Sequence, residues 1–218
     1  MRLSCKSVYG RNQPIKKKTV FHTVHYHVYS GLLVPLPHIR FEQQKRESLM
    51  NILREIQTAL MSDDTHIGHI LLKMRFVAAQ LGSDLLADWV KHELEGYPRD
   101  ISVPDYRRIS VTYTGTFSGP FGSGINNAPL PSHLIKKFAG PQWLTHEERQ
   151  SISSLYEMYE NTKKNKDGFF QIDATNLILL LQGKIYEGYA CNSVTGKVST
   201  SQVFNILFLV RSRLLDLT

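Results

Sequence analysis

The spacing of apolar residues changes abruptly between Leu85 and Tyr113, and this change constrains the fold more than any other feature. From Leu85 to Leu94, apolar residues recur every three or four positions, which is the period of an amphipathic helix. After Pro104, apolar and polar residues alternate from Ile109 to Tyr113, which is the period of a half-buried strand. A chain that carries both periods in adjacent segments must combine helices with strands.

Helical periods predominate in the rest of the chain. The helices that we predict cover residues 48–62, 65–81, 83–95, 130–138, 145–159, 173–185 and 199–217. Short links join the first three, so we expect antiparallel neighbours in a small bundle. A short strand is predicted at 169–172, followed by that helix from 173 and then a loop through Asn192 and Gly196. The predicted fold is α+β and mostly helical, with an N-terminal helical bundle packed with a small β-sheet or hairpin, and further C-terminal helices.

The formal charge of +7 belongs to one segment. Residues 1–47 hold nine Lys or Arg and two Asp or Glu, which gives +7, whereas residues 48–218 hold seventeen of each, which gives zero. Phosphate binding requires clustered Lys and Arg, so an electroneutral body makes nucleic acid a weak candidate partner. The sequence predicts two parts: a basic extension over 1–47 and a domain over 48–218.

The extension has two interpretations. It lacks a sustained helical or strand period, so we expect it to be poorly ordered; alternatively it is a wrongly called gene start, with translation beginning at Met50. Its histidines, His22, His25 and His27, are closely spaced but lack a companion cysteine or acid, so we assign no metal to them.

The two cysteines, Cys5 and Cys191, are far apart and form no C-x-x-C pair. They are typical of free thiols in a reducing compartment, and they predict a cytoplasmic location. No apolar run approaches the length of about 18 residues that a membrane-spanning helix needs.

Catalytic motifs are missing from the sequence. It contains no G-x-S-x-G elbow, and the pairs His92-Glu93 and His146-Glu147 lack the second histidine of a zinc-protease motif. The glycine-rich stretch from Gly115 to Gly124 lacks the Lys-Ser/Thr of a phosphate-binding loop, so we interpret it as a mobile loop or hairpin connection. We therefore assign no catalytic, cofactor-binding or metal-binding residue, and we weigh against an enzyme without excluding one.

One acid is out of place on the helix over 83–95. Glu93 follows Trp89 by four positions and so lies on, or at the edge of, the apolar face, where an unpaired carboxylate costs several kcal/mol. We predict that it pairs with Arg107, with Trp89 and Tyr106 packed beside the pair. Such a pair would clamp the loop between residues 93 and 107.

The same stretch carries a motif, W-x-x-x-E-L-x-G-Y followed by P-x-Y-R. Its residues are Trp89, Glu93, Leu94, Gly96, Tyr97, Pro104, Tyr106 and Arg107. This pattern resembles the AbiTii domain family, named for a component of bacterial abortive phage-infection systems, and the similarity runs from about Leu49 to Thr218. The resemblance implies a role in phage resistance but supplies no reaction. It also implies a part of a larger defence protein, so we expect a junction or a truncation at Thr218.

Two functions remain open. In the first, the domain is a non-catalytic sensing or protein-interaction module whose partner, a fused or neighbouring defence component, contacts the segment from Tyr113 to Ile125. In the second, it is a toxin effector that attacks RNA or another essential target, with Glu93, Arg107 and nearby acids as its site. The electroneutral body without a catalytic motif favours the first.

Overall fold

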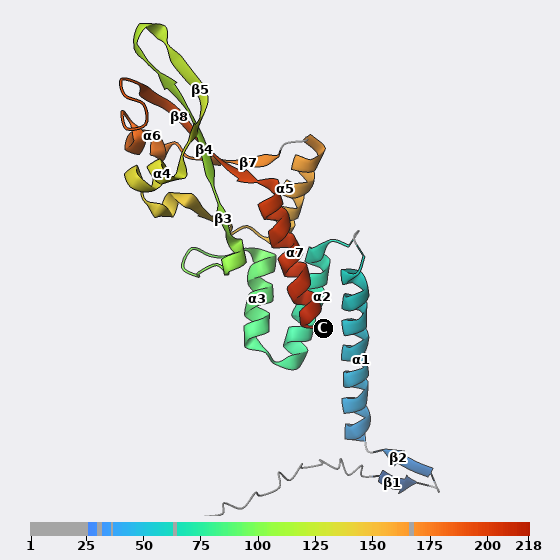
Figure 1. Cartoon of the computed structure of the whole chain (residues 1–218). Helices are drawn as coiled ribbons and strands as arrows, with labels where there is room; N and C mark the ends of the chain where they lie inside the picture. Colours follow the sequence, from blue (N-terminus) through green and yellow to red (C-terminus); the bar gives the residue numbers. More distant parts are fainter. Residues whose placement is uncertain (1–25, 30–31, 36, 63–64, 166–167) are drawn as a thin grey trace, which may run out of the picture. The chain divides into compact units, whose positions relative to one another are not determined.

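The computed structural model describes residues 26–29, 32–35, 37–62, 65–165 and 168–218. The chain divides into two compact units, Met1–Glu47 and Ser48–Thr218. Figure 1 shows the helices and strands of both units. Over the part of the chain that is described, the predicted α+β, mostly helical fold is confirmed.

The first unit contains more regular structure than the sequence predicted. Strands β1 (Tyr26–Tyr29) and β2 (Leu32–Pro35) pair antiparallel. Helix α1 (Pro37–Leu60) then begins at Pro37, so the predicted start at Ser48 is wrong. Proline is well suited to the first helical turn, but the following residues carry no clear apolar period and gave no sign of a helix. The side chains of the three clustered histidines lie outside the described residues.

Four helices of the second unit pack together, with the C-terminal part of α1. They are α2 (Ile67–Leu81), α3 (Asp84–Glu95), α5 (Ile152–Asn165) and α7 (Thr200–Asp216). Ser83 caps α3 as predicted, and Gly82, with φ of 64°, ends α2. The cap of α2 is His66, whose Nδ1 accepts a hydrogen bond from the Gly68 amide at 3.1 Å. Burial and the neighbouring His69 lower the pKa of His66, which favours the neutral imidazole that this bond requires.

The buried faces follow the predicted helical period except at helix ends. Three side chains expected in the core are exposed: Leu81 by 58%, Leu85 by 87% and Leu217 by 50%. Each lies at the first or last turn of its helix or just beyond it, where the helix leaves the bundle and has no neighbour to cover it.

A four-stranded antiparallel sheet, in the order β5-β4-β8-β7, forms the other half of this unit (Figure 1). Its strands are β4 (Thr112–Ser118), β5 (Gly124–Leu130), β7 (Phe169–Asp173) and β8 (Ala190–Ser199). The prediction of a loop through Asn192 and Gly196 is wrong, because these residues belong to strand β8. Asn and Gly are uncommon in strands and concealed the alternation, yet a Cβ at Gly196 would lie 3.2 Å from the Tyr113 ring, so glycine permits close packing there.

Shorter elements complete the unit. They are η1 (Asp105–Arg107), β3 (Arg108–Ser110), η2 (Pro120–Gly122), α4 (Ser132–Phe138), η3 (Pro141–Leu144), β6 (Thr145–Glu147) and α6 (Asn176–Leu181). Residues 145–147 form a strand that pairs with β3, so the helix predicted from Thr145 begins only at Ile152. Helix α6 ends at Leu181, earlier than the predicted residue 185, because Gly183 adopts φ of 66°. The glycine-rich stretch forms the β4–β5 hairpin.

No helix in the described part of the chain is both long enough and apolar enough to cross a membrane.

Candidate functional site

The motif residues gather where α3 meets η1. Helix α3 presents Trp89 and Glu93 one turn apart on the same face, and η1 follows Pro104 and supplies Tyr106 and Arg107. Glu93 and Arg107 both have side chains with 0% of their surface exposed. The structure therefore brings the ends of the motif together inside the protein.

The predicted ion pair between Glu93 and Arg107 is confirmed. Nη2 of Arg107 donates to Oε2 of Glu93 at 2.6 Å, and Nε donates to Oε1 at 3.3 Å. This two-point contact matches the planar fork of a guanidinium to a carboxylate and fixes the orientation of both groups.

Two tyrosines complete the surroundings of the carboxylate. The hydroxyls of Tyr97 and Tyr106 donate to Oε1 of Glu93 at 2.8 Å and 2.5 Å, and Nε1 of Trp89 donates to the Tyr106 hydroxyl at 3.0 Å. Burial, and then the adjacent Glu93 charge, raise the pKa of both phenols, so they stay protonated as donors. No buried side-chain nitrogen or oxygen in the described part of the chain lacks a hydrogen-bond partner.

The other terminal nitrogen of Arg107 binds backbone oxygens 41 and 43 residues further along the chain. Nη1 donates to the Glu148 carbonyl at 3.1 Å and to the Gln150 carbonyl at 2.6 Å. The guanidinium also lies over the Tyr97 ring, 4.9 Å from its centroid. Burial alone would lower the pKa of Arg107, but the hydrogen bonds and charge of Glu93 outweigh it and raise the pKa. One arginine thus joins α3, η1 and the segment before α5.

Gly96 belongs to the same junction for a steric reason. Its φ of 93° is a conformation that other residues rarely adopt, and a Cβ there would lie 2.9 Å from the Arg149 carbonyl oxygen. That oxygen accepts the Tyr97 amide hydrogen at 2.8 Å. Glycine therefore allows the chain leaving α3 to lie directly against residues 149–151.

Sequence reasoning missed Arg149 and Glu148. Arg149 donates to the carbonyls of Pro98 and Ile101, the latter at 2.8 Å, and so holds the loop between α3 and η1. Glu148, only 5% exposed, accepts from the Gln150 amide at 3.0 Å. Neither residue belongs to a periodic pattern, and both fell within the helix predicted from Thr145, so no local signal separated them from surface charges.

The two charged side chains of this network are closed to solvent, and so to a substrate. Neither Glu93 nor Arg107 lines the cavities that border α7, although Trp89 and Tyr106 beside them each line one. Every guanidinium nitrogen of Arg107 and both carboxylate oxygens of Glu93 are already hydrogen-bonded within the protein. Within the described residues, no group of three or more His, Cys, Asp or Glu is placed to hold a metal ion. What the arrangement does chemically is to neutralise and fix two charges inside the fold.

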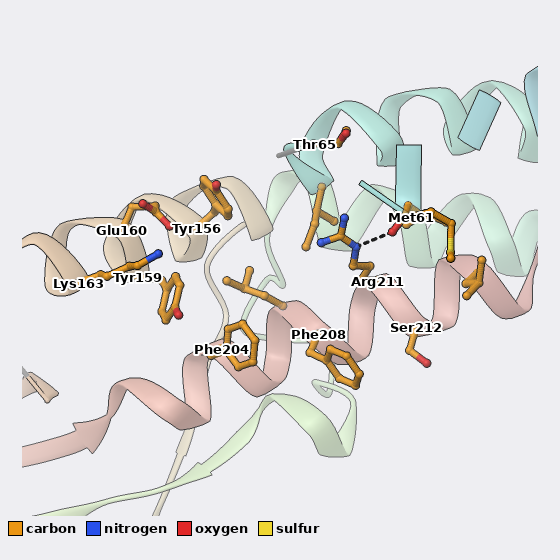
Figure 2. Close-up of a pocket in the computed structure, with 14 residues that line it drawn as sticks. Met61, Thr65, Tyr156, Tyr159, Glu160, Lys163, Phe204, Phe208, Arg211 and Ser212 are labelled. Atoms are coloured by element: carbon orange, nitrogen blue, oxygen red, sulfur yellow. Dashed lines mark hydrogen bonds between the residues drawn. The ribbon is translucent and has the colours of Figure 1, made fainter. Parts of the chain in front are cut away.

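A separate cavity of about 650 Å³ opens between α5, α7 and the end of α1 (Figure 2). Its lining is mainly apolar and aromatic, with a few charged and hydroxyl groups. The lining residues are Leu60, Met61, Thr65, Ile67, Tyr156, Tyr159, Glu160, Lys163, Phe204, Leu207, Phe208, Arg211, Ser212 and Leu215. A pocket of this size and composition is typical of binding sites, and sequence reasoning did not single it out.

Comparison with known proteins identifies the family of this chain. The sequence model of the AbiTii family matches residues 51–218, which is most of the chain and all of the second unit except its first three residues. No curated protein matches the chain, and no solved structure matches it. The chain belongs to the AbiTii family, which is associated with abortive infection, a form of phage defence.

Proposed function

We propose that this chain acts in abortive infection as a non-catalytic protein-interaction module, which senses infection or holds a toxin, and that it docks through the β4–β5 hairpin. The partner is a fused or neighbouring defence protein. The observation that carries the proposal is the complete burial of Glu93 and Arg107. A catalytic acid and its partner must reach a substrate, whereas these two bind only the protein itself.

In contrast to the buried pair, the tip of the β4–β5 hairpin is accessible to a partner. Phe121 is 107% exposed at its tip and adopts φ of 56°, a left-handed conformation that is costly for a large side chain. The turn is nevertheless well fixed: the Gly119 amide donates to the Ser123 carbonyl at 2.7 Å, and the Ser123 amide donates to the Pro120 carbonyl at 3.1 Å. A strained, fully exposed aromatic side chain on a fixed turn is well suited to bind a partner with little loss of entropy.

Tyr189 supports the turn from below. A Cβ at Gly119 would lie 2.5 Å from its ring, and the Tyr189 hydroxyl is within 3.4 Å of the Ser123 hydroxyl. Gly119 and Ser123 belong to the segment from Tyr113 to Ile125, and Tyr189 packs against them from outside it. The proposed contact surface is therefore the tip of the hairpin, centred on Phe121.

We also infer a cytoplasmic location for the module. Cys191 is a free thiol, 5% exposed, and free cysteines are usual in a reducing compartment. Its burial raises the pKa of the thiol, which lowers its reactivity.

The test is phage plating on a bacterial host that carries the gene with its neighbouring genes. We expect Phe121→Asp to remove protection, seen as at least about a tenfold rise in plating efficiency, without lowering the melting temperature, because the side chain packs against nothing. Phe76→Asp is the matched control, since Phe76 is an exposed aromatic residue on α2, 47% exposed, and far along the chain from the hairpin.

The toxin alternative makes the opposite prediction in uninfected cells. Expression of the chain alone would then arrest growth, and Glu93→Gln would relieve the arrest while circular dichroism still showed a folded protein. That result, or full protection by Phe121→Asp, would contradict the proposal.

A further inference from the structure

Helix α7 carries two apolar faces, and only one of them lies in the core. The inner face is buried through Val203, Ile206, Leu207, Val210 and Leu214. On the outer face, Phe204, Phe208 and Leu215 follow at intervals of four and seven and are 49%, 56% and 44% exposed. With a rise of about 1.5 Å per residue, this outer stripe is about 16 Å long, or three helical turns. Exposed apolar residues in a line at helical spacing indicate a contact surface more strongly than scattered ones do.

The stripe borders the cavity between α5 and α7. Figure 2 shows Phe204 and Phe208 on α7 and Tyr156 and Tyr159 on α5, on the two sides of this hollow. The rings of Tyr159 and Phe204 are 5.5 Å apart. Met61, 76% exposed, lies at the α1 end. Aromatic residues, methionine and arginine are the residue types enriched in protein interfaces, which favours a protein over a small ligand as the occupant.

Charges of both signs line the same hollow. Glu160 and Lys163 come from α5, and Arg211 comes from α7 (Figure 2). Arg211 is held in place because its Nε donates to the Leu60 carbonyl at 2.9 Å. The face thus presents projecting rings, a hollow, the acid Glu160 and the base Lys163 within one small area.

We propose that two copies of this chain associate through this face, α7 against α7, about a twofold axis, with Phe204 and Phe208 of each copy entering the hollow of the other. A twofold contact places the same surface on both sides, so the surface must carry both projections and hollows, and both signs of charge. This face meets that requirement, whereas a foreign helix would need only the hollow. Residues 48–218 carry seventeen bases and seventeen acids, so the two bodies do not repel each other through net charge.

The area of the proposed dimer contact is small, and this limits the affinity that we expect. A face three turns long and two helices wide is at the low end of specific interfaces, so we expect a reversible dimer with a dissociation constant on the order of micromolar. The inference is independent of the role proposed for the hairpin, because it concerns different residues of the same unit.

Sedimentation velocity of the full chain across the micromolar range tests the proposal. The mass should rise with concentration from 24.9 kDa toward about twice that value. Phe208→Asp and, separately, Leu215→Glu should stay monomeric at every concentration, because each puts a charge into the apolar stripe that the two copies share. Two controls, Phe76→Asp and Phe121→Asp, should dimerise like the wild type.

A wild-type chain that stays monomeric would overturn the proposal and leave the face to another protein or to the basic segment of this chain. A dimer that neither Phe208→Asp nor Leu215→Glu weakens, although both variants fold, would overturn it too. Loss of phage protection in Phe121→Asp with normal dimers, or the reverse, separates this inference from the proposed role of the hairpin.

Discussion

The motif junction and the outer surface of the same unit differ in almost every respect. At the junction, Glu93 and Arg107 are closed to solvent and bind each other, two tyrosines and distant carbonyls. On the outside, Phe121 and Phe208 are exposed by 107% and 56%. Three of the motif side chains, Glu93, Tyr97 and Arg107, are thus buried, whereas Phe121 and Phe208 belong to no motif. This difference indicates that Glu93 and Arg107 maintain the fold, and it supports the proposal that a partner contacts exposed residues outside the motif.

Among the substitutions that test this difference between junction and surface, Arg107→Ala is expected to lower the free energy of unfolding most. It leaves the Glu93 carboxylate buried without its partner, so the free energy of unfolding should fall by about 3–5 kcal/mol. Urea denaturation measures it. The neighbouring Arg108→Ala is the matched control: that side chain is 46% exposed and pairs with Asp105 and Glu147 at 3.3 Å and 3.8 Å, so its loss should cost less than about 1 kcal/mol. If both substitutions lowered the free energy of unfolding equally, the buried junction would be no more important to stability than the surface.

The next effect is expected for Gly96→Ala. The new Cβ would meet the Arg149 carbonyl oxygen at 2.9 Å and would impose φ of 93° on alanine, so we expect a loss of about 1–3 kcal/mol. Gly122→Ala in the hairpin shares the positive φ, 75°, but has nothing within 4 Å of the new atom. It should cost only about 1 kcal/mol of backbone strain. Thermal unfolding of the two variants therefore measures what the clash and the ψ of 165° at Gly96 add to a positive φ.

Alkaline pH should weaken the junction through its tyrosines. Burial and the adjacent Glu93 raise the pKa of Tyr97 and Tyr106 above the ordinary value of 10.0, so the folded state keeps protons that the unfolded chain releases. The free energy of unfolding should therefore hold its full value below pH 10 and fall as the pH rises above it. Tyr97→Phe should make this fall shallower in urea titrations, whereas an unchanged slope would argue against the placement of the phenol beside Glu93.

The smallest effects on stability are expected on the outer surface. Phe121→Asp removes a fully exposed ring, so its free energy of unfolding should stay within about 0.5 kcal/mol of the wild type. Phe208→Asp removes a ring that is 56% exposed, so it should cost about 1 kcal/mol when measured on dilute protein. A loss of several kcal/mol for either variant would show that its ring belongs to the fold and would remove the contrast with Arg107.

The sequence was sufficient to predict half of the junction. Glu93 lies on an apolar helix face, where a carboxylate requires a partner, and this requirement led to Arg107 and to the packing of Trp89 and Tyr106. The contacts of Arg107 with residues 148 and 150 could not be predicted. They are made by the backbone carbonyls of Glu148 and Gln150, and a backbone carbonyl is the same in every residue. A contact of this kind leaves no mark in the sequence.

The errors in the predicted fold have similar physical causes. Strand β8 was missed because Asn192 and Gly196 are poor strand formers that tertiary packing overrides between β4 and β7. The outer stripe of α7 was not recognised because periodicity shows that residues share a face and leaves open whether anything covers it. Strand β8 and the exposed stripe of α7 were both missed because each depends on which segments pack together in three dimensions.

The most direct test of the structural role of the motif is a double-mutant cycle on Glu93→Gln and Arg107→Ala, with the free energy of unfolding measured by urea denaturation. If the two side chains form one buried clamp, the second substitution should cost much less once the first is present, with a coupling of about 2 kcal/mol or more. A coupling below about 0.5 kcal/mol would mean that the two residues act independently and would contradict the account.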